Sequence, residues 1–360
     1  MLSELTNAAL KNIPIERPQP AVFNFKKFGN FPCAGQTLQK NMTHFRLDDS
    51  GYIAYQKLGK DRFIIGDPVI AGDRFEEILR AFLSRYPLSS FVQCSKKTAL
   101  ILKSLGCYLT PLGIETFLKL PYRLEGAGRC DIRHLANCAK RAGLKIQELQ
   151  ISQLRGDWLC STFAGLTNGA VRFSGELKFL AVSSLNEQIP GSRIFAGFDN
   201  NRLVGTSLFF TMYDNGKVFG YSEVVPKRNP AAPKGTRVGV LLGAIRQFES
   251  EGVKVVSLGL SPFYKVKETY DSCSVGNCRE SAKLFEMIYK YADISFNYKG
   301  LSFHKSRFRG IEKAAYFASK KKLPVAELLK IYRLTTGRWL PPVFKRKVRE
   351  VSINQLPSFF

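Results

Sequence analysis

A basic, proline-rich loop is the segment of this sequence in which chemistry is easiest to place. The run Pro226-Lys-Arg-Asn-Pro-Ala-Ala-Pro-Lys-Gly-Thr236 carries three bases, and an apolar helix is expected directly after it. A helix N-terminus offers free backbone N–H groups and a partial positive charge, so this loop suits a phosphate or an ester substrate; the alternative is a solvated basic loop. The predicted substrate-binding residues here are Lys227, Arg228, Lys234, Gly235 and Thr236.

A second candidate segment alternates aromatic and basic side chains. Such a pattern combines base stacking with phosphate contact, as a single-stranded acceptor end requires. A histidine in the segment is a candidate general base. The alternative is a core-packed aromatic pair with exposed bases. The residues concerned are Phe303, His304, Lys305, Arg307, Phe308 and Arg309.

A third candidate is the basic helix expected over 132–142, which ends at Gly143. Arg133, Lys140 and Arg141 share one face at helical spacing, so the helix predicts a stripe that follows a phosphate backbone. A solvated helix face is the alternative.

The overall charge points to an anionic partner. The chain has 360 residues and a formal net charge of +25, with a concentration of Lys and Arg between Lys299 and Arg349. Such an excess indicates nucleic acid, an anionic membrane surface, or both. The mixture of bases with Trp and Phe after Arg338 fits either partner.

Neither a metal nor a cofactor is expected. The eight cysteines lie mostly in apolar segments, no CxxC occurs, and three histidines are too few for a familiar zinc site. No signal-peptide core is present, and the longest aliphatic run, Val238 to Ile245, is too short to span a bilayer. These features predict a cytoplasmic protein whose membrane contact is peripheral, at the inner face of the membrane.

The periodicity of apolar residues predicts an α/β protein in which an alternating order of strands and helices occurs twice. Thr236 is expected to cap the helix over 237–250. The expected strands are 51–58, 61–65, 91–94, 116–120, 193–198, 203–212, 218–225 and 253–258, and the expected helices are 75–86, 97–105, 132–142, 152–167, 237–250 and 325–335.

Several ordered pieces between His44 and Tyr316 resemble a known family, the soluble C-terminal domain of bacterial phosphatidylglycerol lysyltransferases. In chain order they are Ile64-Ile-Gly-Asp-Pro-Val69, Gly113-Ile-Glu115, the helix with Arg133, Asn137 and Arg141, Ala232-Pro-Lys-Gly-Thr236, Leu258-Gly-Leu-Ser-Pro262, and Leu301-Ser-Phe-His-Lys305 with Arg307-Phe308 and Tyr316. Each piece alone is common loop chemistry, whereas six in order are specific. The family's Asp-Leu-Met-Arg pattern has no exact counterpart, and Ala315 stands where the family has Arg.

The resemblance implies two tandem acetyltransferase-like (GNAT) domains with mixed central sheets and a basic helical C-terminal extension. The predicted divisions are a tether over 1–21, a first domain over 22–150, a second domain with the active site over 151–324, and the extension over 325–360. The chain would be a standalone member without the family's membrane-embedded part. The resemblance also implies transfer of an aminoacyl group from aminoacyl-tRNA to a hydroxyl or amine, often of a phospholipid such as phosphatidylglycerol.

Within that expectation, Glu223, Lys305 and His304 are the predicted catalytic residues. Glu223 would lie at a strand end and hold the α-ammonium or a basic side chain of the aminoacyl group, the alternative being an exposed edge-strand acid. Arg307 and Tyr316 join the loop residues in binding substrate. The predicted tRNA contacts are Arg133, Lys140, Arg141 and Arg309. Two other functions stay open: an acyl-CoA-dependent acetyltransferase, and a non-catalytic protein that binds RNA or membrane.

Overall fold

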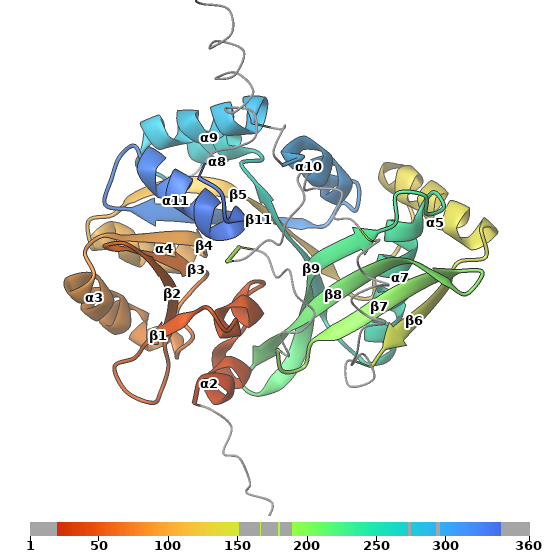
Figure 1. Cartoon of the computed structure of the whole chain (residues 1–360), viewed down its shortest axis with the longest axis horizontal. Helices are drawn as coiled ribbons and strands as arrows, with labels where there is room; N and C mark the ends of the chain where they lie inside the picture. Colours follow the sequence, from red (N-terminus) through yellow and green to blue (C-terminus); the bar gives the residue numbers. More distant parts are fainter. Residues whose placement is uncertain are drawn as a thin grey trace, which may run out of the picture.

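One continuous mixed sheet runs through the computed structural model, which describes residues 20–150, 166, 179–180, 189–272, 275–292 and 296–339 (Figure 1). Within those residues, eleven strands pair in the order β1-β2-β3-β4-β11-β5-β10-β9-β8-β7-β6. Only the pairs β3–β4 and β9–β10 are parallel there. The strands are β1 (Thr43–Phe45), β2 (Ile53–Leu58), β3 (Asp61–Ile65), β4 (Ser89–Cys94), β5 (Tyr108–Lys119), β6 (Lys145–Leu149), β7 (Arg193–Asp199), β8 (Arg202–Asp214), β9 (Lys217–Arg228), β10 (Val255–Pro262) and β11 (Ile311–Ser319).

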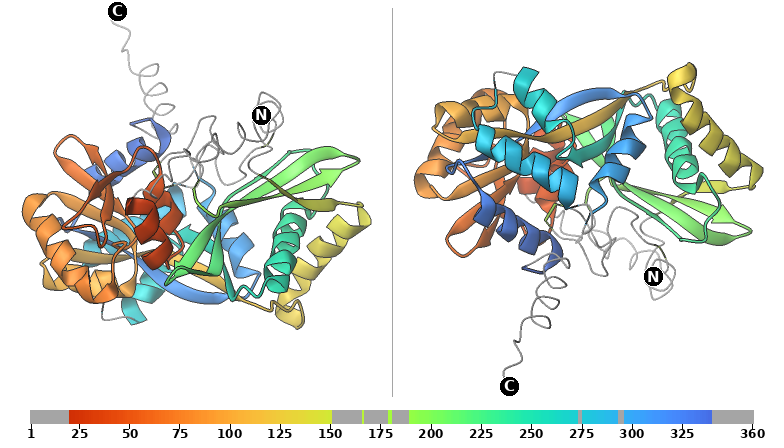
Figure 2. Two further views of the ribbon diagram at one scale, coloured as in Figure 1. Left: turned by 90° about the horizontal axis from the view of Figure 1, so that it is seen from below. Right: turned by 90° about the horizontal axis from the view of Figure 1, so that it is seen from above.

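Helices cover both halves of this sheet. Helices α5 and α7 lie together against one face of β6 to β9, and α8 to α11 gather over the middle strands (Figures 1 and 2). The helices are α2 (Pro20–Phe28), α3 (Phe75–Arg85), α4 (Lys96–Ser104), α5 (Cys130–Arg141), α7 (Thr236–Ser250), α8 (Val266–Ser272), α9 (Arg279–Tyr291), α10 (Tyr298–Ser306) and α11 (Val325–Thr336), with short 3-10 turns at Ala34–Leu38, Gly72–Arg74 and Ala127–Arg129.

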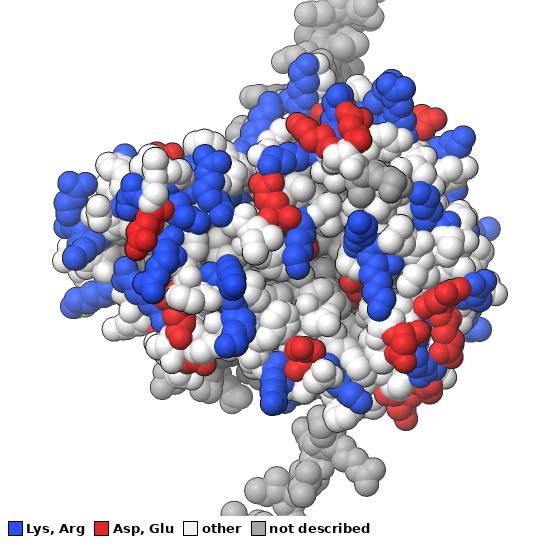
Figure 3. Space-filling view, turned by 180° about the vertical axis from the view of Figure 1, so that it is seen from behind, with Lys and Arg blue, Asp and Glu red and all other residues white. Residues whose placement is uncertain are grey.

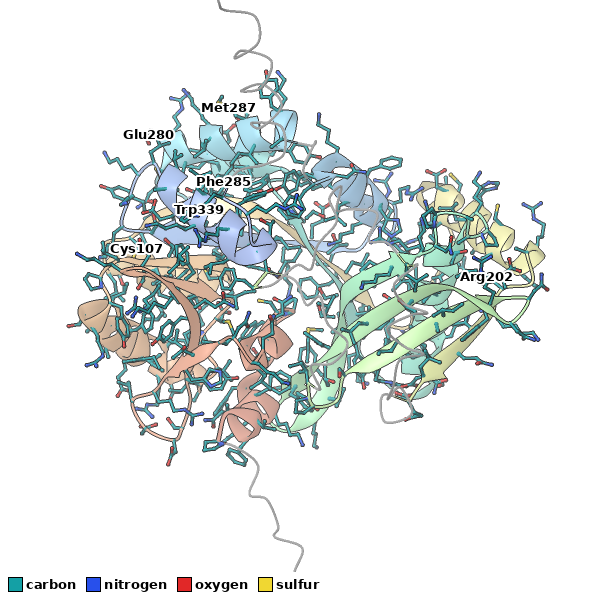
Figure 4. All side chains as sticks on the ribbon, viewed as in Figure 1. Cys107, Arg202, Glu280, Phe285, Met287 and Trp339 are labelled. Carbon is teal, nitrogen blue, oxygen red and sulfur yellow. The ribbon has the colours of Figure 1, made fainter. Side chains whose placement is uncertain are left out.

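Helix α9 shows how amphipathic sequence sets these layers. Phe285 is fully buried and points from α9 into the molecule, whereas Met287 on the same helix points outward and is 58% exposed (Figure 4). Apolar side chains three and four residues apart share one helix face, so burying that face fixes the helix on the sheet. Phe285 packs edge-on against Phe263 and Phe317, with ring centroids 5.2 and 5.7 Å away.

A shared core joins the two ends of the sheet. One cluster of buried side chains includes Phe25 of α2, Tyr52 beside β2, Phe210 of β8 and Phe285 of α9. The ring of Phe25 meets that of Tyr213 at 5.2 Å, which fastens α2 to the long hairpin of β8 and β9. Segments from both predicted domains therefore bury one another's apolar surface.

The mixed α/β class predicted from the sequence is confirmed, and most predicted elements are present within one or two residues of their expected bounds. Strand β6 pairs with β7, and β11 enters between β4 and β5, so each half of the sheet includes a strand from the other predicted domain. The division into two domains at residue 150 stays a prediction. The expected helix over 152–167 lies outside the described residues, apart from residue 166, as do 1–19 of the tether and 340–360 of the extension.

The predicted cap of α7 was wrong. The helix begins at Thr236, and Gly235 holds the N-cap position with φ +90° and no side-chain cap. The Thr236 hydroxyl instead donates to the Pro233 carbonyl at 2.7 Å. Helix α5 causes this arrangement, because a Cβ at position 235 would overlap the Leu135 carbonyl oxygen. Glycine permits both the left-handed backbone and the close approach.

Gly235→Ala should therefore lower the free energy of unfolding by about 3 kcal/mol, since left-handed strain of about 1 kcal/mol adds to an overlap with rigid backbone. Gly252→Ala is the matched control: it also has positive φ, at +76°, but a Cβ there meets nothing within 4 Å. The control should cost about 1 kcal/mol. Equal losses in urea unfolding would contradict the role assigned to α5.

Candidate active site

A cavity of about 490 Å³ lies between the sheet and helices α9, α10 and α11. Most of its wall is apolar, and a few polar side chains gather where it meets strands β9 and β10. A largely apolar cavity with a small number of convergent polar groups is the usual form of a ligand site. The apolar wall includes Leu112, Leu258, Leu284, Ile288, Phe296, Phe317, Leu328 and Ile331.

The polar end forms where β9 and β10 separate. The two strands pair up to Ser222 and Ser257, after which β9 stays with β8 and β10 with β5. A bulge in β10 contains Gly259, whose φ is +72°. Glu223 follows the last pair directly and lines the cavity at 6% exposure. Its Oε1 accepts a 2.6 Å hydrogen bond from the Ser207 hydroxyl.

Glu223 therefore lies within β9, whereas the sequence predicted that it would lie at a strand end. The alternative of an exposed edge-strand acid is wrong, because both β8 and β10 flank β9 and the side chain is buried. A buried carboxylate needs hydrogen bonds or a cation nearby, and Ser207 supplies only one hydrogen bond.

Lys305 reaches the same end of the cavity from α10. It is 5% exposed, and its Nζ donates to the Leu260 carbonyl at 2.7 Å. Burial lowers the pKa of Lys305 to about 7, and the charge of Arg237 acts in the same direction, against the carboxylates of Glu223 and Glu115. Near neutral pH a substantial fraction of this amine is uncharged, so it can accept a proton.

Arg237, in the first turn of α7, also lines this end. Its Nε is buried and has no hydrogen-bond partner among the described residues, and the same holds for Nε2 of His304 and Nε of Arg307. Burial lowers the pKa of His304 well below its usual value, and the charges of Arg237, Arg307 and Lys305 add to this effect. Arg307 donates to His304 Nδ1 at 3.3 Å. A neutral imidazole therefore lies within a group of cations.

Gln93 provides a polar group on the opposite wall, and Glu115 lies behind it. Gln93 lines the cavity, and its backbone has φ +61°, in the left-handed region that favours glycine. Its Nε2 donates to Glu115 Oε1 at 2.7 Å. Burial raises the pKa of Glu115 to about 7, against this hydrogen bond. Strained residues of this kind are held in place by surrounding structure and concentrate at ligand sites.

The predicted loop residues lie outside the cavity wall. Gly235 and Thr236 join α7 to α5 and the loop, as described above. Lys234 is exposed, with its Nζ 3.2 Å from Nε2 of His134 on α5. Lys227 and Arg228 belong to β9, where they pair with β8, and are not loop residues. Their roles in binding substrate stay predictions.

The predicted tRNA contacts lie on one side of the molecule. Lys140 and Arg141 are exposed at the end of α5, whereas Arg133 is half-buried and donates to the Leu124 carbonyl at 2.7 Å. Arg309 donates to the Gly128 carbonyl at 3.3 Å. Lys and Arg outnumber acids on the left side of Figure 3, where α5 and α7 lie.

The aromatic residues near Lys305 separate into two environments. Phe308 is fully buried in the core under α7, as the alternative interpretation held, and Phe303 is 60% exposed with the Arg307 guanidinium 4.8 Å from its ring. Tyr316 is 2% exposed within β11 and does not contribute to the cavity wall. The structure thus brings together Glu223 and Lys305, with His304 behind them, but not Tyr316.

Three residues of the site were missed as functional candidates: Arg237, Gln93 and Glu115. Arg237 directly follows the loop run, so its position at the start of a helix was a usable signal. Glu115 was part of a motif without a role. Nothing in the sequence around Gln93 indicates its left-handed backbone, which arises from the bulge between β4 and β11.

Over the described ranges, no three His, Cys, Asp or Glu side chains are grouped so that they could hold a metal ion. In the same part of the chain, none of the helices combines the length and the apolar character that crossing a membrane requires.

Comparison with known proteins places the fold and site in a family. Residues 24–319 match the model of the C-terminal domain of phosphatidylglycerol lysyltransferase. A lysylphosphatidylglycerol synthase structure (L-PGS) from Bacillus licheniformis has a TM-score of 0.73 at 18% identity, covering 90% of this chain and 98% of that one. The C-terminal domain of a proposed lysylphosphatidylglycerol synthetase from Agrobacterium fabrum has a TM-score of 0.70 at 16% identity, covering 88% and 97%. Among curated protein sequences, none matches closely.

The chain therefore belongs to the phosphatidylglycerol lysyltransferase C-terminal family, as the sequence resemblance indicated. At 16–18% identity, the structural likeness shows a shared mixed α/β fold. The match covers every described strand of the sheet and the helices that carry Arg237 and Lys305, whereas the wall supplied by α11 lies beyond the matched residues.

Glu115→Gln tests the electrostatics of the site. Because burial raises the pKa of Glu115 to about 7, the folded protein binds this proton up to a higher pH than the unfolded chain, and wild-type stability falls as pH rises from about 4.5 to 7. The variant lacks this loss. The difference in free energy of unfolding between the variant and the wild type should therefore shift in favour of the variant by roughly 2 kcal/mol from pH 5 to pH 8.

The matched control is Glu125→Gln, at an exposed position. Urea unfolding of the control should follow the wild type at both pH values. A difference between Glu115→Gln and wild type that does not depend on pH would contradict the raised pKa.

Proposed function

We propose that this protein transfers an aminoacyl group from aminoacyl-tRNA to a hydroxyl group of a phospholipid. The observation that carries the proposal is the cavity itself: a long apolar wall ends at Glu223, Lys305 and Arg237 in a member of the lysyltransferase family. An acyl chain suits the apolar wall, and the reacting head group then lies at the polar end.

An aminoacyl ester is already activated, so transfer depends on positioning and charge stabilisation more than on a strong nucleophile. Glu223 would accept hydrogen bonds from the α-ammonium of the aminoacyl group, since its Oε1 has one partner, Ser207. The Leu260 carbonyl holds Lys305 on the other side of the β9–β10 separation. The ester would therefore lie between the carboxylate and the amine.

In the reaction, the acceptor hydroxyl oxygen attacks the ester carbonyl carbon. Neutral Lys305 takes the hydroxyl proton, a tetrahedral intermediate forms, and the bond to the ribose oxygen breaks. Lys305 then returns the proton to that oxygen, which leaves as the free tRNA terminus. The lowered pKa of Lys305 suits both steps, because the group must gain and lose a proton near pH 7. His304, also predicted as catalytic, lies behind Lys305 and outside the cavity wall.

The packing of α5 supports an aminoacyl ester over acyl-CoA. A CoA pyrophosphate would need an open, glycine-rich loop before α7. Here the loop has one glycine, Gly235, whose backbone lies against the Leu135 carbonyl. A non-catalytic protein that binds RNA or membrane is the remaining alternative, and the transfer assay below separates it from an enzyme.

The test is discharge of a pool of charged tRNA by the purified protein, with and without phosphatidylglycerol vesicles, while the organic phase is followed for each amino acid. Lipid-dependent transfer is expected. Glu223→Gln should lower kcat/KM by roughly 100-fold or more, because it removes the charge that holds the ammonium. Glu268→Gln, an exposed acid on α8, is the matched control and should keep wild-type activity. Binding of tRNA without any discharge would overturn the proposal.

A second prediction concerns the tRNA surface. Replacing Lys140 and Arg141 with Ala should weaken tRNA binding and lower the slope of log K against log salt concentration by about 1.5, since two phosphate contacts are lost. Lys57→Ala with Lys60→Ala, two exposed bases on the β2–β3 hairpin, is the control. Equal salt slopes for the two double variants would show that α5 does not contact the backbone.

A further inference from the structure

Resting on the proposed function, we infer that the donor carries an aminoacyl group with an uncharged side chain, and that Arg237 is the residue that excludes lysyl and arginyl groups. Two structures similar in fold are described as lysylphosphatidylglycerol synthetases. The charges at the polar end of this cavity do not fit a lysyl side chain.

The first argument for an uncharged side chain is the balance of charges around Glu223. Among the described residues that line the cavity, Glu223 is the only carboxylate, and the guanidinium of Arg237 lines the same end. Arg307 lies close enough to influence the pKa of Arg237, and Arg228 does the same. Glu115 is a further acid that acts on the pKa of Lys305, and it is bound to Gln93 on the opposite wall. One fully available carboxylate can match one ammonium only.

The second argument rests on a buried hydrogen-bond donor that has no acceptor. Nε of Arg237, a residue that lines the cavity, is buried without a hydrogen-bond partner in the described part of the chain. Buried donors of this kind are completed by oxygen acceptors, whereas an ammonium group brings further donors and further positive charge. Two like charges about 6 Å apart at an effective dielectric constant near 20 repel strongly enough to change binding more than tenfold.

The remaining wall near Glu223 shows what side chain would fit. Val224, Pro226, Leu258 and Leu260 line the cavity on either side of the β9–β10 separation. An aminoacyl group whose α-ammonium lies at Glu223 would therefore place its side chain against aliphatic surface. Such a surface stabilises an uncharged side chain and gives a terminal ammonium no acceptor.

The experiment compares donors of matched shape. Lysyl-, arginyl-, methionyl- and alanyl-tRNA are supplied separately with phosphatidylglycerol vesicles, and kcat/KM is measured for wild type, Arg237→Met, Arg237→Lys and Arg246→Met. Methionyl and lysyl groups are both unbranched and of similar length. Wild type should prefer at least one uncharged donor to lysyl by tenfold or more. Arg237→Met should raise lysyl transfer about tenfold relative to methionyl transfer.

Arg237→Lys keeps the charge and should keep the discrimination, and Arg246→Met changes an exposed base on the same helix and should leave every ratio unaltered. Thermal unfolding checks that each variant is folded. If wild type prefers lysyl- or arginyl-tRNA, the inference is wrong while the proposed function stands. An unaltered ratio in folded Arg237→Met removes Arg237 from the explanation. If wild type discharges neither these four donors nor any other aminoacyl-tRNA of the charged pool in the presence of lipid, the proposed function is overturned instead.

Discussion

The separation of β9 from β10 after Ser222 and Ser257 is the constraint on which the rest of the site depends. Continued parallel pairing would fill the sheet with ladder hydrogen bonds and leave no opening. Once the strands separate, β9 keeps β8 as its partner and β10 keeps β5, so both stay supported while a space opens between them. The side chain of Glu223 and the carbonyl of Leu260 border that space, and the second of these holds Lys305.

The cavity's two ends depend on each other. The apolar walls supplied by α9 and α11 exclude water from the end of the cavity, and this exclusion makes a charge there costly. The lowered pKa of Lys305, the neutral His304 and the raised pKa of Glu115 all follow from burial as their largest cause. Shifts of this kind at several neighbouring groups are characteristic of functional sites, and here they surround one cavity.

The sequence was most informative where a property is local. Apolar periodicity located helix α3, helix α7 and the β8–β9 hairpin closely, and ordered motifs identified the family. The entry of β11 between β4 and β5 was not predictable, because pairing partners are a long-range choice that strand periodicity does not specify. The environment of a buried side chain was equally unpredictable from the sequence. Lys305 and Tyr316 belong to one family signature, yet Lys305 lines the cavity and Tyr316 packs in the core.

The same distinction explains why basic residues were difficult to sort from sequence. Formal charge counts Lys140, Arg237 and Lys305 alike. Lys140 is exposed, Arg237 is buried with no acceptor for its Nε among the residues that the structure describes, and Lys305 has its pKa lowered to about 7. An exposed base attracts a polyanion over a distance that salt screens, whereas a buried base acts on a bound group at contact distance. The net charge of +25 therefore combines bases on the surface with bases that lie inside the protein beside the cavity. The guanidinium of Arg237 lines the cavity, so it raises the free-energy cost of bringing another positive charge close to it.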